Sequence, residues 1–178
     1  MSESHSARKP RGPQVGIVVA SDAELPVMHA AADALSQLGV PCELRVASAL
    51  RTPDDVAEYA RGARERGLKV LVAGAAGAAH LAGALAAHTT LPVVAVPVAR
   101  DPLRGLDALL SSVQAPPGTP VATVSIDGAA EAGLLAAQIV GTSDEDVAAR
   151  LAAHKLDLAE ACRAANRNLA RDKPRSKS

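Results

Sequence analysis

Aromatic side chains are almost absent from this sequence of 178 residues. It contains no Phe and no Trp, and Tyr59 is its only aromatic residue. A core without large rings must be packed from Ala, Val, Leu and Ile, which favours close contacts between helices and a sheet. A chain of this length can bury most of its foldable surface in one core, so we expect a single domain.

Net charge, paired cysteines and long apolar runs are also missing. The 19 Lys and Arg residues balance 19 Asp and Glu residues, which gives no electrostatic reason to expect nucleic acid or an anionic membrane as a partner. Cys42 and Cys162 have no zinc or redox spacing, so both are expected to be reduced and no metal site is indicated. No apolar run matches a membrane span or a secretory signal, so we expect a cytoplasmic protein.

What the sequence does contain is a regular alternation of apolar runs and helical patterns. The runs predict five strands, at 15–20, 42–48, 69–73, 93–98 and 120–126. The segments between them predict helices at 24–38, 52–67, 80–88, 103–113 and 129–140. Such alternation implies right-handed crossovers and a parallel sheet. We therefore predict a flavodoxin-like, three-layer α/β/α domain over residues 14–141.

A further helical pattern, at 145–169, comes after the predicted sheet is complete. It forms one stripe of Val147, Leu151, His154, Leu158 and Cys162. We expect this C-terminal extension, residues 142–170, to pack on a neighbouring subunit. The polar segments 1–13 and 171–178 are expected to be disordered tails.

The first two loops after strands are candidates for a nucleotide-phosphate site, because ligands of open parallel sheets bind beyond the carboxyl ends of the strands. Ser21 offers hydroxyl and amide donors and Glu24 could accept hydrogen bonds from sugar hydroxyls, although Ser21 could simply cap the next helix. Arg51 follows Ser48 and stands just before a helix start, against the helix dipole. An anionic ligand explains that position best, and a buried salt bridge is the alternative.

The third such loop, Gly74 to His80, consists of small residues. Its glycines permit close approach of a ligand to the backbone, but it lacks the Lys-Ser/Thr of a P-loop and does not predict an ATP site. His80 could carry a proton, or could be a structural hydrogen-bonding residue.

Six segments in this order resemble the PurE family, the 5-(carboxyamino)imidazole ribonucleotide mutases and aminoimidazole ribonucleotide carboxylases of purine biosynthesis. They are SDAELPVM at 21–28, SALRTPDD at 48–55, 63–83, LPVVAVPV at 91–98, 105–124 and AGLLAAQI at 132–139. The resemblance implies a flavodoxin-like subunit of an octamer, with a nucleotide monophosphate substrate and neither a metal nor an organic cofactor. From the balanced charge, we expect no nucleic-acid and no membrane partner.

The resemblance also implies roles for individual residues. Ser21 and Arg51 would hold the 5′-phosphate with help from Ser48, and Glu24 would stand where the family usually has Asp for the ribose. The pocket for the base and carbon dioxide would be lined by residues of the third loop and the helix start, namely Gly74, Ala75, Gly77, His80 and Leu81.

One position departs from the family pattern at the chemical step. The family moves a proton with the histidine of Ser-Ala-His-Arg-Thr-Pro, but the third residue here is Leu50, which cannot carry a proton. Three hypotheses follow. The protein could be a slowed mutase that uses His80 or water, an enzyme of altered chemistry such as a decarboxylase, or a non-catalytic nucleotide-binding subunit.

Overall fold

The structure is a computed structural model that describes residues 12–171. The expected disordered tails fall almost entirely on residues 1–11 and 172–178, which lie outside the described residues.

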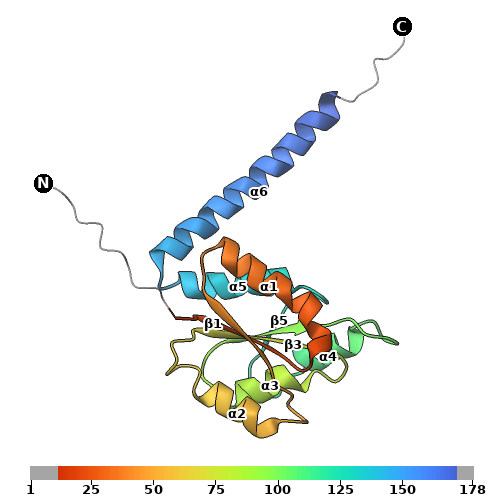
Figure 1. Ribbon diagram of the computed structural model, residues 1–178. Coiled ribbons are helices and arrows are strands. Elements are labelled where there is room, and N and C mark those ends of the chain that lie inside the picture. The colour runs from red at the N-terminus through yellow and green to blue at the C-terminus, as the bar shows by residue number, and fades with distance from the viewer. Residues whose placement is uncertain (1–11, 172–178) are drawn as a thin grey trace, which may run out of the picture.

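Five parallel strands form one sheet in the middle of the domain (Figure 1). They are β1 (Val15–Val19), β2 (Cys42–Val46), β3 (Val70–Ala75), β4 (Val93–Pro97) and β5 (Ala122–Thr123). Their spatial order is β2-β1-β3-β4-β5, which is the flavodoxin-like order and confirms the predicted fold class. The three central strands are buried along their whole length, as expected for a parallel sheet covered on both faces.

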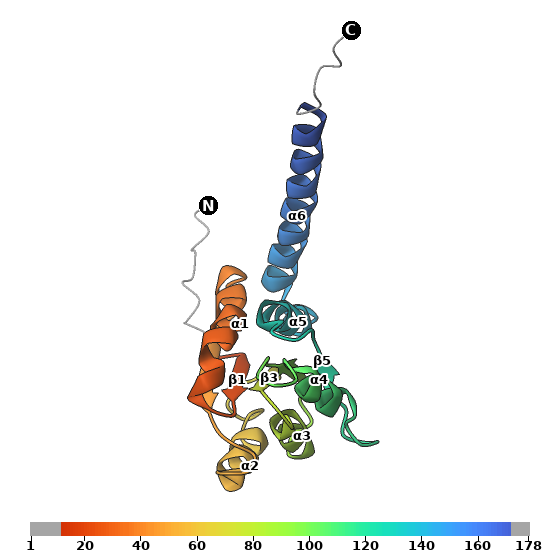
Figure 2. The same ribbon diagram turned by 90° about the vertical axis from the view of Figure 1, so that its right-hand side faces the viewer.

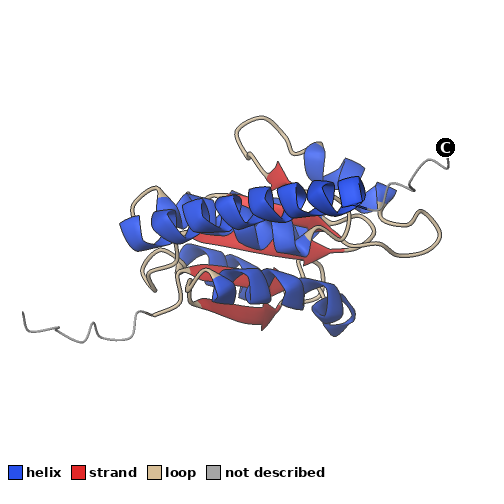
Figure 3. Ribbon diagram, turned by 90° about the horizontal axis from the view of Figure 1, so that it is seen from above, coloured by secondary structure: helices blue, strands red, loops and turns tan. Residues whose placement is uncertain are grey.

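Helices cover both faces of this sheet (Figures 2 and 3). On one face lie α1 (Leu25–Gln37) and α5 (Ala129–Gly141), and on the other lie α2 (Pro53–Arg61), α3 (His80–Ala87) and α4 (Leu106–Val113). Successive strand side chains point to opposite faces, so Ile17 packs in the core under α1 and α5 whereas Val18 packs in the core under α2 and α3.

Three predicted boundaries are wrong, and each has a local cause. Helix α2 ends at Arg61 instead of near Gly67, because turns occupy 62–67 and Gly67 has a φ of +94°. Helix α4 begins at Leu106 instead of Leu103, because the preceding Gly105 has a φ of +87°. The strand expected at 120–126 is only two residues long, since β5 is an edge strand that pairs with Val94 and Ala95 alone.

The last helix, α6 (Glu145–Arg171), projects from the domain (Figure 1). Its start is attached to the body, because Val147 is buried and Arg150 Nε donates to the Leu38 carbonyl at 2.5 Å. Farther along the predicted stripe, Leu158 is 58% exposed. No helix in the described part of the chain is long and apolar enough to cross a membrane.

Candidate active site at the carboxyl edge of the sheet

The first loop joins β1 to α1 through a short 3₁₀ turn, η1 (Asp22–Glu24). Ser21 donates twice to Glu24 Oε2, from its backbone N at 2.7 Å and from its Oγ at 2.6 Å. Glu24 is only 3% exposed. The two residues predicted to contact phosphate and ribose are therefore bonded to each other, in a reciprocal cap at the start of the helical segment.

The second loop folds around the hydroxyl of Ser48. Ser48 Oγ accepts the backbone N–H of Arg51 at 3.2 Å and of Leu50 at 3.4 Å. Thr52 occupies the N-cap position of α2, but its hydroxyl turns back and accepts the Ser48 N–H at 3.0 Å instead of capping the helix. Ser48 Oγ keeps its own proton for a further acceptor, since a hydroxyl is both a donor and an acceptor.

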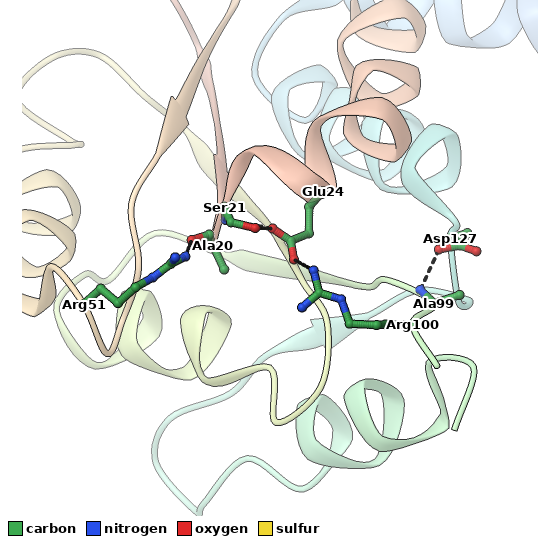
Figure 4. Close-up of polar contacts among 7 residues, drawn as sticks. All are labelled: Ala20, Ser21, Glu24, Arg51, Ala99, Arg100 and Asp127. Atoms are coloured by element: carbon green, nitrogen blue, oxygen red, sulfur yellow. Dashed lines mark hydrogen bonds and ion pairs between the residues drawn. The ribbon is translucent and has the colours of Figure 1, made fainter. Parts of the chain in front are cut away.

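Arg51 connects the first two loops. Its Nη2 donates to the carbonyl oxygen of Ala20 at 2.6 Å, as Figure 4 shows. Its side chain is exposed, and it has no carboxylate partner within residues 12–171, so the buried salt bridge considered above is not formed. A guanidinium has five N–H donors, so Arg51 can bind Ala20 and still offer donors to an anion.

The second and third loops enclose a small cavity of about 130 Å³. Leu50 stands at its edge with a side chain that is 75% exposed, and His80, the first residue of α3, is also exposed. The structure thus brings Leu50 and His80 to one cavity. The remaining lining residues are Ala20, Ser48, Ala49, Ala75, Ala76, Ala78, Ala79 and Leu81.

Gly74 and Gly77 do not line this cavity. A Cβ added to Gly74 would lie 2.6 Å from the side chain of Met28, so the glycine is needed there for packing between β3 and α1. Gly77 has open space around it and a φ of +65°, so its requirement is a left-handed backbone. Both glycines thus have a structural requirement, and the expected approach of a ligand to them stays a prediction.

Two residues that the sequence analysis did not single out also belong to this edge. Arg100, in the loop after β4, places Nη2 3.7 Å from Glu24 Oε1. Asp127, in the loop after β5, accepts the backbone N–H of Ala99 at 2.8 Å (Figure 4). Arg100 comes three residues after the end of β4 and Asp127 four residues after the end of β5. A charged residue within a few positions of a strand's carboxyl end is the signal that could have identified them.

The charges at this edge are arranged around the first loop. Arg51 donates to Ala20, the residue before Ser21. The buried carboxylate of Glu24 accepts from Ser21 on Oε2 and faces Arg100 with Oε1. Within the described residues, no three His, Cys, Asp or Glu side chains gather as metal ligands. The arrangement can present serine hydroxyls, backbone amides and arginine donors to an anion next to a small, largely apolar cavity.

These features define the class of the protein: a flavodoxin-like α/β domain with arginine-bearing loops and a cavity at the carboxyl edge of its sheet. Comparison with known proteins is more specific. The AIR carboxylase family matches residues 14–161, which include the whole sheet, the three loops and the first part of α6. The chain belongs to this family, the PurE family, and the resemblance noted in the sequence is confirmed.

Several curated relatives share one name. The N5-carboxyaminoimidazole ribonucleotide mutase of Mycobacterium tuberculosis is 52% identical over 159 residues, covering 89% of this chain and 91% of the relative. The protein of the same name from Bacillus subtilis is 57% identical over 141 residues, covering 78% of this chain and 87% of the relative. A crystal structure of a Treponema denticola PurE2 variant has the same fold, with a TM-score of 0.82, 22% identity and coverage of 89% and 99%.

Proposed function

We propose that the protein binds 5-(carboxyamino)imidazole ribonucleotide and moves its carboxylate to the ring carbon, giving 4-carboxy-5-aminoimidazole ribonucleotide in purine biosynthesis. The observation that carries the proposal is the cavity between Ser48–Leu50 and Ala75–Leu81, directly beside Ser21 and Arg51. The name shared by the curated relatives, which are about half identical to this chain, supports the same activity.

In this proposal the second loop and Ser21 hold the phosphate. Arg51 offers the guanidinium donors that remain beside its bond to Ala20, and Ser48 offers its hydroxyl proton. The start of α2 adds the positive end of a helix dipole. Glu24 is the proposed partner of the ribose hydroxyls, once its carboxylate no longer accepts both donors of Ser21.

The reaction requires one proton to move within the cavity. The carbamate C–N bond breaks to release carbon dioxide, and the exocyclic nitrogen takes up a proton. The carbon dioxide then forms a bond to the ring carbon, which loses its proton. A side chain that carries this proton contributes about 100- to 10,000-fold to the rate. Leu50 cannot do so, and we propose that His80, which is exposed and lines the same cavity, takes part in a slower transfer.

A second candidate function rests on the exposure of Leu50. An apolar side chain that is 75% exposed at the edge of a binding cavity can cover a bound carboxylate and remove water from it, which favours loss of carbon dioxide. The alternative is therefore decarboxylation or nucleotide binding without turnover. The expectations of no metal, no organic cofactor and a cytoplasmic location stay predictions.

The activity is tested by incubating the protein with 5-(carboxyamino)imidazole ribonucleotide and measuring both ring-carboxylated product and released carbon dioxide. We expect slow formation of product by the wild type and a rate about 100-fold higher for Leu50→His. The matched control is Leu110→His, which adds a histidine to an exposed position away from the cavity. Carbon dioxide without product would favour the decarboxylase, and a wild-type rate that Leu50→His does not raise would contradict the role given to Leu50.

The phosphate site is tested separately by calorimetry with 5-aminoimidazole ribonucleotide. Replacing Arg51 by Ala removes a charge-assisted contact and should weaken binding about tenfold or more. Arg64→Ala is the control, because Arg64 is an exposed arginine that donates to Thr90 away from the cavity. Equal binding by the wild type and by Arg51→Ala would contradict the assignment of the phosphate site to this edge of the sheet.

A further inference from the structure

The Glu24 carboxylate uses the donors that a phosphate at the first loop would need. Ser21 gives both its backbone N–H and its hydroxyl proton to Glu24 Oε2, at 2.7 and 2.6 Å. Because the carboxylate is buried, water solvates it poorly and it depends on these donors. A phosphate that binds Ser21 must therefore take over bonds that a second, buried anion already holds.

Arg100 is the cation that faces the other side of this carboxylate. Its Nη2 lies 3.7 Å from Glu24 Oε1, and within residues 12–171 no other cation lies within ion-pair distance of Glu24. The loop that carries it is tied down on both sides, since Ala99 N–H donates to Asp127 at 2.8 Å and Arg104 N–H donates to the Arg100 carbonyl at 2.8 Å. The guanidinium itself is exposed and can move.

We propose that Arg100 is a positioning residue that acts on phosphate binding through Glu24. When the nucleotide phosphate accepts the hydrogen bonds of Ser21, Arg100 Nη2 moves from 3.7 Å to hydrogen-bond distance of Glu24 Oε1. Arg100 then donates to the carboxylate in place of Ser21. Without it, the released carboxylate would be buried next to a phosphate of the same sign, which repels it. This inference rests on the proposed function, because it requires a phosphate monoester at Ser21 and Arg51.

A double-mutant cycle tests the proposal, with 5-aminoimidazole ribonucleotide binding measured by calorimetry in the full chain. Arg100→Gln should weaken binding about tenfold in the wild-type background. In the Glu24→Gln background the same change should have little effect, because no carboxylate charge is left to neutralise. Arg100→Lys should restore most of the affinity, since it keeps the charge. Thermal unfolding of each variant shows whether it is folded.

Four results would overturn the proposal, the first three without contradicting the proposed function. An equal loss in both backgrounds would mean that Arg100 contacts the ligand directly. If Arg100→Gln lowered the melting temperature but left the dissociation constant of the ligand unchanged, Arg100 would have a structural role only. Binding that is lost in Arg51→Ala but insensitive to Arg100→Gln would remove this inference and leave the proposed function intact. Absence of binding by the wild type would instead contradict the proposed function, and this inference with it.

Discussion

Tyr59, the only aromatic residue, is buried and contacts three charged side chains. Its hydroxyl donates to Glu43 Oε1 at 2.8 Å, and the guanidinium carbons of Arg66 and Arg45 lie 4.5 and 5.3 Å from the ring centre. Burial, and then the hydrogen bond and negative charge of Glu43, raise the pKa of Tyr59 above its ordinary value of 10.0. The folded protein therefore favours the neutral phenol.

This shift predicts a loss of stability at high pH. A raised pKa in the folded state contributes stability that is fully present below pH 10 and decreases as pH rises above it. Because no other tyrosine or tryptophan is present, tyrosinate absorbance reports Tyr59 alone. We expect the folded protein to titrate at higher pH than the denaturant-unfolded chain, and Tyr59→Phe to lose less stability above pH 10. Identical titrations of folded and unfolded chains would contradict this account.

Residues of the candidate site were predictable where the signal is local. Ser21, Ser48 and Arg51 lie in the loops that follow β1 and β2, and the structure brings these loops together through the bond from Arg51 to Ala20. The pairing of Glu24 with Arg100 was not predictable, since it joins the loops after β1 and β4, whose positions depend on the strand order. Likewise, only the packed structure reveals that Gly74 faces Met28.

At the scale of elements, the close contact of α1 with α5 depends on small residues. A Cβ added to Gly133 would lie 2.6 Å from the Ala31 carbonyl oxygen and 3.0 Å from the Ala34 Cβ. Because both helices are packed on the sheet, neither can move away freely. The sequence lacks Phe and Trp, and at this contact small residues allow the two helices to approach closely.

Gly133→Ala should therefore destabilise the protein by about 1–3 kcal/mol, since it overpacks a tight helix contact. Gly83→Ala is the matched control, because Gly83 also lies within a helix, α3, but has no atom within 4 Å of an added Cβ. Alanine there should be neutral or stabilising by about 0.5–1 kcal/mol. Urea unfolding of both variants measures the difference, and equal midpoints would show that the helix contact adjusts at no cost.

At the scale of the whole molecule, α6 and α4 leave apolar side chains uncovered. Leu158 on α6 and Leu106, Leu110 and Val113 on α4 are all about half exposed or more. Leu158 continues the stripe whose first residues, Val147 and Leu151, pack against the domain's own core. We propose that the later part of this stripe packs on a neighbouring subunit in a homo-oligomer, the octamer expected from the family.

Leu158→Asp should then reduce the mass of the assembly measured by light scattering, because a charge would be buried between subunits. Leu156→Asp is the control, since Leu156 lies on the same helix at 69% exposure but off the stripe. It should leave the mass unchanged. An unchanged mass for both variants, or an equal loss for both, would contradict the role of the stripe.

The sequence by itself determined the alternation of strands and helices, the parallel sheet, the loop that carries Ser21 and the loop that carries Ser48 and Arg51. These features are encoded locally, in hydrophobic periodicity and in the residues that follow each strand. The tertiary structure alone decided that Ser21 is bonded to Glu24, that Arg100 faces the same carboxylate, and that Leu50 and His80 share one cavity. The last two contacts join loops distant in sequence, which become neighbours only when the strands take their places in the sheet. The bond from Ser21 to Glu24 is local, and it depends on the side-chain conformation that the short 3₁₀ turn adopts.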